Sequence, residues 1–206
     1  MNARHRLLSR LSSTLAAVTV LLLLTPGASL AAQAGAPARA TNARSVSLRL
    51  VDVTHVLGRG LTAGKAGYTS KPSAMGACTS TPPVTDYTAD FYGPVRTKGV
   101  LNVVSDVYTY RSASGPVCNQ KIDISTYKVL GGTLGKMTTV HGVGGQAFLL
   151  DTTGPKSQEP TVYTLALKFT RGMYRAIIIV QSNKGIKAAD MIKLARIVDG
   201  RIRRTD

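Results

Sequence analysis

The chain has 206 residues, of which 44% are hydrophobic and 17% are charged, and its formal net charge is +16 at pH 7. This composition excludes an intrinsically disordered chain, and the length suits one globular domain after an N-terminal leader. The positive charge favours anionic partners, although a charged surface also keeps an exported protein soluble. No block of five or six like charges occurs, so the sequence does not indicate a specific nucleic-acid interface.

The N-terminal segment has the pattern of a cleavable secretory signal peptide. Arg4, Arg6 and Arg10 precede the uncharged apolar run 15–24, and small residues follow at 28–34. A run of about ten apolar residues is too short to span a bilayer. Neither a lipoprotein cysteine nor a twin arginine accompanies it. We therefore expect a signal peptide at 1–34 and a secreted, extracellular product, released or associated with the envelope, with no transmembrane segment in its mature form.

The mature chain is expected to begin with a flexible lead-in at 35–45, which lacks periodicity and has few large apolar side chains. A single domain then covers 46–206. Its first element is predicted to be a short helix at 50–57, because four apolar residues share one helical face and Gly58 follows as a suitable end. The β-branched residues of this segment favour a strand instead, so that alternative stays open.

The middle of the chain predicts two strands separated by loops and a weak helix. Residues 60–73 are rich in glycine, lysine and serine and predict a loop, and a strand is expected at 74–81, before two prolines. Apolar residues on both faces of 100–110 predict a long central strand. A turn is expected at 111–116. The segment 127–137 keeps helical spacing, although each of its glycines costs a helix interior about 1 kcal/mol.

The last third predicts a strand, a hairpin and a helix. A short strand is expected at 146–151, and strands at 162–169 and 173–181 flank a tight turn at Arg171 and Gly172. The helix at 187–203 carries an apolar stripe suited to lie across a sheet. The element order predicts an α+β fold, in which a twisted antiparallel sheet is covered on one face by the short N-terminal helix and the C-terminal helix.

The chain contains two cysteines, Cys78 and Cys118. In an exported protein they predict a disulfide, which closes a loop of about forty residues and contributes roughly 4 kcal/mol in the chain-entropy model. A catalytic thiol would leave the second cysteine unexplained. We expect the disulfide to join the turn after the long strand to the strand before it.

Two short motifs lie in the last third of the chain. Residues 142–148 read Gly-Val-Gly-Gly-Gln-Ala-Phe, and Leu194-Ala195-Arg196 with Arg201 follows the hairpin turn. This pattern resembles small actinobacterial envelope proteins, which include exported lipoproteins of unknown function and the extracellular sensor domains of certain receptor-type serine/threonine kinases. The resemblance covers most of 45–204 and implies a twisted antiparallel sheet, flanking helices and a groove for ligands. It supplies no catalytic residues, and Gly145 stands where an acidic residue is common.

His55 and His141 are the candidates for catalysis. A secreted, basic, lysine-rich protein with two histidines fits a ribonuclease-like hydrolase of phosphodiesters, in which one imidazole acts as base and the other as acid. No motif surrounds either histidine, and one helical and one loop histidine are the ordinary alternative. The glycines at 142–145 lack the Gly-Lys-Ser/Thr of a phosphate loop. The aspartates show no metal-ligand spacing, so we predict no metal and no cofactor.

Eight tyrosines dominate the aromatic content. Tyrosine rings beside lysine and arginine side chains on a sheet can line a groove for a sugar-containing or anionic ligand, and strand packing is the alternative. The candidate ligand-binding residues are Tyr108, Tyr110, Lys168 and Arg175.

These observations predict a secreted, non-catalytic binding or sensor-like module of the cell envelope. Its basic surface would bind an anionic envelope polymer or lipid headgroups. One alternative is a phosphodiester hydrolase that uses His55 and His141. The other is a protein–protein partner or inhibitor that acts on an envelope protein.

Overall fold

The computed structural model describes five stretches of the chain: residues 43–69, 78–94, 99–129, 135–153 and 162–205. The chain divides into two units, Met1–Ala34 and Gly35–Asp206, and all described residues belong to the second. The predicted signal peptide and most of the predicted lead-in lie outside these stretches. Within them, no helix has the length and apolar character needed to cross a bilayer.

The described strands form one seven-stranded sheet, in which every neighbouring pair is antiparallel. In chain order the strands are β1 (Thr62–Tyr68), β2 (Thr85–Tyr92), β3 (Val100–Thr109), β4 (Lys136–Val140), β5 (Gln146–Asp151), β6 (Tyr163–Arg171) and β7 (Tyr174–Ser182). Across the sheet their order is β1-β2-β3-β7-β6-β5-β4. The helices are α2 (Leu50–Leu57), α3 (Ser114–Val129) and α4 (Ala188–Arg203), and one further helical turn lies at 43–46.

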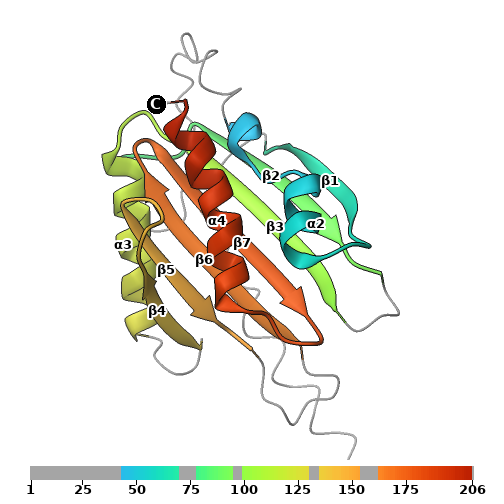
Figure 1. Ribbon diagram of the computed structural model, residues 1–206. Coiled ribbons are helices and arrows are strands. Elements are labelled where there is room, and N and C mark those ends of the chain that lie inside the picture. Colours follow the sequence, from blue (N-terminus) through green and yellow to red (C-terminus); the bar gives the residue numbers. More distant parts are fainter. Residues whose placement is uncertain (1–42, 70–77, 95–98, 130–134, 154–161, 206) are drawn as a thin grey trace, which may run out of the picture. The chain divides into compact units, whose positions relative to one another are not determined.

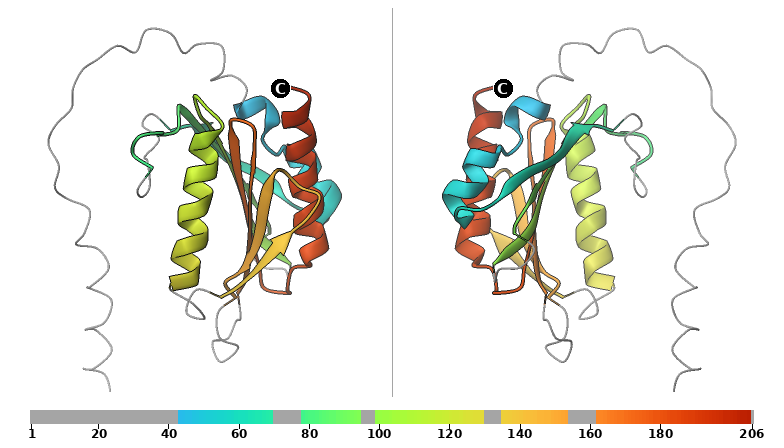
Figure 2. Two further views of the ribbon diagram at one scale, coloured as in Figure 1. Left: turned by 90° about the vertical axis from the view of Figure 1, so that its left-hand side faces the viewer. Right: turned by 90° about the vertical axis from the view of Figure 1, so that its right-hand side faces the viewer.

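The helices lie on both faces of the sheet (Figures 1 and 2). α2 and α4 cover one face, and α3 covers the other, against β6. The α+β fold, the antiparallel sheet, the short N-terminal helix and the C-terminal helix are therefore confirmed. The expectation that only one face is covered is wrong, because α3 was not recognised as a helix from its sequence.

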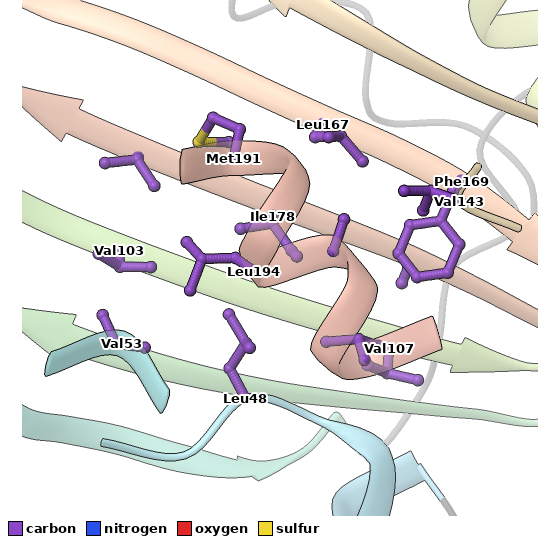
Figure 3. Packing of buried hydrophobic residues seen from close by; sticks show 14 of the residues in the cluster. Leu48, Val53, Val103, Val107, Val143, Leu167, Phe169, Ile178, Met191 and Leu194 are labelled. Atoms are coloured by element: carbon purple, nitrogen blue, oxygen red, sulfur yellow. The ribbon is translucent and has the colours of Figure 1, made fainter. Parts of the chain in front are cut away.

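The main core lies between the sheet and α4 (Figure 3). Alternate residues of β6 and β7, such as Leu167, Phe169 and Ile178, point to this side and meet Met191 and Leu194 of α4. All five side chains are completely buried. The period of two along the strands and the helical spacing of the stripe on α4 bring these residues together. Both patterns were readable in the sequence, so this part of the fold was predicted correctly.

The glycine motif before β5 has a structural role. Gly142 and Gly144 adopt positive φ angles of 76° and 57°. A side chain at Gly144 would collide with the carbonyl oxygen of Thr170, and the next residue, Gly145, donates its N–H to that oxygen over 2.7 Å. Glycine therefore lets the loop pack against the end of β6.

The α3 helix is tethered by the Cys78–Cys118 disulfide, with the two Cα atoms 6.0 Å apart. The predicted pairing is confirmed, but its surroundings differ from the prediction. Cys118 lies inside α3, because the helix starts at Ser114 where a turn was expected, and Cys78 begins a turn where a strand was expected. The rest of that expected strand, 74–77, lies outside the described residues.

Two further expectations for the middle of the chain were wrong, and one strand was missed. The expected loop at 60–73 contains β1, whose glycines and alanines conceal the strand pattern. The unassigned residues 85–92 form β2. The weak helix expected at 127–137 is not one element: in the described residues, α3 ends at Val129 and β4 begins at Lys136.

Candidate functional site

A groove of about 520 Å³ opens between the segment that precedes α2 and the strands β1 and β2. Its walls include the buried side chains of Leu48, Tyr87, Ala89 and Phe91. On the β1 side the lining residues are small: Ala63, Gly64 and Ala66. The same small residues that conceal β1 in the sequence therefore leave space beside it.

Arg44 and Arg49 supply positive charge to this groove, and both residues are exposed. In the parts of the chain that the structure describes, neither guanidinium forms an ion pair with a carboxylate. Asp90 also lines the groove, and its Oδ2 accepts a hydrogen bond of 3.4 Å from the Tyr92 hydroxyl. The groove thus combines apolar walls with two available guanidinium groups.

The segment that carries these arginines is fixed to the sheet and to α4. The hydroxyls of Ser47 and Ser105 lie 3.1 Å apart, and both residues are buried. The backbone N–H of Leu48 donates to the same Ser105 hydroxyl over 3.4 Å. From α4, Arg201 donates through Nη1 to the Ser47 carbonyl over 2.6 Å. One wall of the groove therefore has a defined position before any ligand binds.

A second polar cluster lies under α3, on the other face of the sheet. Asp123 of α3 accepts hydrogen bonds from Lys168 Nζ, at 2.9 Å, and from Arg175 Nη2. Lys168 Nζ also donates to the Tyr127 hydroxyl over 3.2 Å. The Arg175 guanidinium lies over the Tyr108 ring, 5.6 Å from its centroid. We call Asp123, Lys168, Arg175 and Tyr108, together with Tyr110, the α3-face cluster.

The four predicted ligand-binding residues therefore meet in one place. Tyr110 belongs with them because its hydroxyl hydrogen-bonds to Arg175. The α3-face cluster is largely buried, with side-chain exposures of 12% for Lys168 and 9% for Arg175. Their role in ligand binding stays a prediction.

Burial governs the electrostatics around this cluster. Desolvation raises the pKa of Tyr108 and of Tyr110 above the ordinary value. On the neighbouring strands, desolvation raises the pKa of Asp86, against a hydrogen bond from Thr69. It also raises the pKa of Asp106, where Asp86 adds like-charge repulsion. The tyrosine hydroxyls thus stay neutral donors, and the two aspartates are costly to ionise.

The sequence analysis did not identify two residues that are central to these sites, Asp123 in the α3-face cluster and Arg44 in the groove. Asp123 has a readable signal: it is the acidic residue of α3, four positions before Tyr127 on the same helical face. It was missed because α3 was not predicted beyond its last turns. Arg44 has no local signal, since the groove forms only when its segment packs beside β1 and β2.

The catalytic candidates His55 and His141 come from different elements. His55 lies in the last turn of α2, His141 lies in the loop between β4 and β5, and both are exposed. Among the described residues, no three histidine, cysteine or acidic side chains are arranged to hold a metal ion.

Comparison with known proteins shows a likeness to a solved structure. No family model matches the chain, and no curated protein matches it significantly. Among solved structures it is similar to the extracellular domain of PknH from Mycobacterium tuberculosis, with a TM-score of 0.55 and 11% sequence identity. The match covers 82% of this chain and 98% of that chain. The fold therefore resembles that of a kinase extracellular domain, as the two C-terminal motifs had indicated.

Proposed function

We propose that this protein is a secreted, non-catalytic, sensor-like binding module of the cell envelope, and that its groove takes an anionic ligand with an apolar part. The fold supports this proposal because it is shared with the extracellular domain of PknH. The Cys78–Cys118 disulfide supports an extracellular location, because such bonds persist in oxidising compartments.

The observation that carries the proposal is the pair Arg44 and Arg49 beside the apolar walls of the groove. A guanidinium presents paired N–H donors to a phosphate or carboxylate, and such charge-assisted hydrogen bonds are stronger than neutral ones. The apolar walls can bury hydrocarbon, which contributes roughly 25 cal/mol per Å² removed from water. The volume also falls in the range of about 300–1,000 Å³ that is typical of small-molecule sites.

The α3-face cluster is a second location for ligand binding. Its cations, Lys168 and Arg175, already bind Asp123. An anion there would have to compete with that carboxylate, whereas the guanidinium groups of Arg44 and Arg49 form no ion pair in the described residues. Asp90 also lines the groove, but it forms no ion pair with Arg44 or Arg49 in the described residues. We therefore place the anionic ligand in the groove first.

Calorimetric titration with dodecyl phosphate, below its micelle concentration, tests the proposal. We expect the protein to bind this probe, and butyl phosphate to bind more weakly because it buries less apolar surface. The double variant Arg44→Ala/Arg49→Ala should bind dodecyl phosphate at least about ten-fold more weakly. The control Arg59→Ala/Lys128→Ala removes the same charge from exposed positions outside the groove lining and should bind normally. Equal weakening of both variants would contradict the proposal.

A further inference from the structure

The side of α4 that points away from the sheet is basic. Its opposite side is completely buried through Met191, Leu194, Ala195, Val198 and Ile202. Apart from Ala188 and Ala189, the exposed positions of this helix and of its two flanking residues hold Lys187, Lys193, Arg196, Arg203 and Arg204. Because residues three and four apart share a helical face, Lys193, Arg196 and Arg203 form one stripe.

The acidic residues of the α2–α4 layer offset only part of this charge, because each is paired with one or two basic side chains and other basic side chains are left without an acidic partner. Asp52 binds Arg201 and Asp190 binds Lys193. Asp199, whose side chain is 4% exposed, binds both Arg171 and Arg203. In this layer, Arg196 and Arg204 have no acidic partner among the residues described.

Three other acidic residues lie on the opposite side of the sheet. In β2, Tyr87, Ala89 and Phe91 belong to the core cluster that includes α4, so the alternating Asp86 and Asp90 point to the other face. The register pairs Asp106 of β3 with Thr88 of β2, which places Asp106 on that same face. The two helix-layer arginines without an acidic partner, Arg196 and Arg204, thus lie on the side of the sheet opposite to Asp86, Asp90 and Asp106, and the far side also carries basic residues such as Lys168 and Arg175.

We propose that the outward face of α4 docks the protein onto an anionic lipid bilayer. Basic side chains are attracted to the negative surface potential of anionic lipids, so the side of the molecule that carries basic residues without acidic partners is drawn to the bilayer. Lys193 and Arg203 lie ten residues apart on α4, which gives a basic stripe about 15 Å long. The neighbouring helix α2 leaves Val51 67% exposed, and such apolar side chains strengthen interfacial binding.

A bilayer suits this surface better than a soluble polymer does. α2 and α4 lie side by side on one face of the sheet (Figure 2), and Arg201 of α4 and Asp52 of α2 join them. A polymer gains specificity from a groove, whereas this layer offers charge along the outside of a helix. The docking proposal is independent of the anion proposed for the groove, which involves Arg44 and Arg49.

Co-sedimentation with vesicles tests the proposal, using phosphatidylcholine alone or mixed with phosphatidylglycerol. The test variant is Arg196→Glu/Arg204→Glu on α4. The matched control is Lys121→Glu/Lys128→Glu on α3, because both lysines are exposed on the opposite side of the sheet. Each double variant reverses one charge within its helix and one at its C-terminal end, so net charge and helix-dipole effects match. Thermal unfolding followed by circular dichroism verifies that both variants fold.

We expect the protein to bind only the vesicles that contain phosphatidylglycerol, and to be released at high salt. The partition coefficient should fall at least ten-fold for the α4 variant and less than two-fold for the α3 variant. Equal losses would overturn the proposal, since net charge alone would then explain binding. Binding to soluble polyphosphate without binding to either kind of vesicle would also overturn it. Neither outcome affects dodecyl phosphate binding in the groove, which the Arg44 and Arg49 variants test separately.

Discussion

Arg201, near the end of α4, binds both carboxylate oxygens of Asp52 in α2, with Nη2 2.8 Å from Oδ1 and 2.7 Å from Oδ2. The two side chains are only 15% and 12% exposed. Asp52 also accepts the backbone N–H of Arg49 over 2.8 Å. The C-terminal helix thus holds in place the segment that forms one wall of the groove.

The first prediction concerns this contact. Arg201→Met should lower the free energy of unfolding by about 2 kcal/mol, because Asp52 is left partly buried without its counter-charge. Dodecyl phosphate should also bind more weakly, because the segment that carries Arg49 loses its anchor to α4. Urea denaturation and calorimetric titration measure the two effects.

The matched control is Arg203→Met on the same helix. Arg203 is 57% exposed, and its partner Asp199 keeps Arg171. We expect a change in unfolding free energy below about 1 kcal/mol and no change in affinity. If both variants lost the same stability, the Arg201–Asp52 contact would have no special role.

The second prediction concerns the disulfide. Cys78→Ser/Cys118→Ser should lower the free energy of unfolding by roughly 4 kcal/mol, because the bond closes a loop between residues 40 positions apart. Urea denaturation measures this difference in two ways: the double variant is compared with the unchanged protein, and the unchanged protein is compared with and without reductant. Mass spectrometry of the non-reduced protein should find no free thiol, and two free thiols would contradict the pairing.

The third prediction concerns Asp106. Burial raises the pKa of this carboxyl above its ordinary value of 3.8, so ionised Asp106 opposes folding at neutral pH. This penalty disappears as the pH falls through the raised pKa towards 3.8, because the folded protein then holds the proton. Asp106→Asn should therefore raise the melting temperature at pH 7, and the gain should vanish near pH 4. A variant that is less stable at pH 7 would show that the carboxylate is stabilising.

The fourth prediction concerns Asp123, which neutralises two buried cations. Asp123→Asn should lower the free energy of unfolding by about 3 kcal/mol, since Lys168 and Arg175 keep their charges without an acidic partner. Asp151→Asn is the control, because Asp151 is exposed and its carboxylate is bonded to Thr153. Urea denaturation should show a change below about 1 kcal/mol for the control, and equal changes would contradict the role given to Asp123.

The fold was predictable where one pattern dominated the sequence. β6, β7 and α4 were placed within a few residues, because the apolar strand patterns of β6 and β7 and the helical spacing of α4 are clear in the sequence. The tight turn was also correct: β6 ends at Arg171, and Gly172 follows with φ of 51°. The α3 helix was not predicted, because no single pattern dominates its sequence. Its buried positions include Gly115, Pro116 and Gln120, so no apolar stripe marks it.

Of the two candidate sites, one was predictable from the sequence and the other was not. The sequence placed Tyr108, Lys168 and Arg175 on strands, and their register then made them neighbours. The groove was not predictable, because its walls come from the segment 44–49 and from two strands that the sequence did not reveal. Such a site depends on tertiary packing and leaves no local pattern.

The most direct test of the account is a nuclear magnetic resonance titration of the ¹⁵N-labelled protein with dodecyl phosphate. We predict that the largest amide shift changes fall in the groove walls, at 44–49, 63–66 and 87–91. Shift changes concentrated at Tyr108, Tyr110, Lys168 and Arg175, with the groove walls unaffected, would contradict it and would place the ligand in the α3-face cluster.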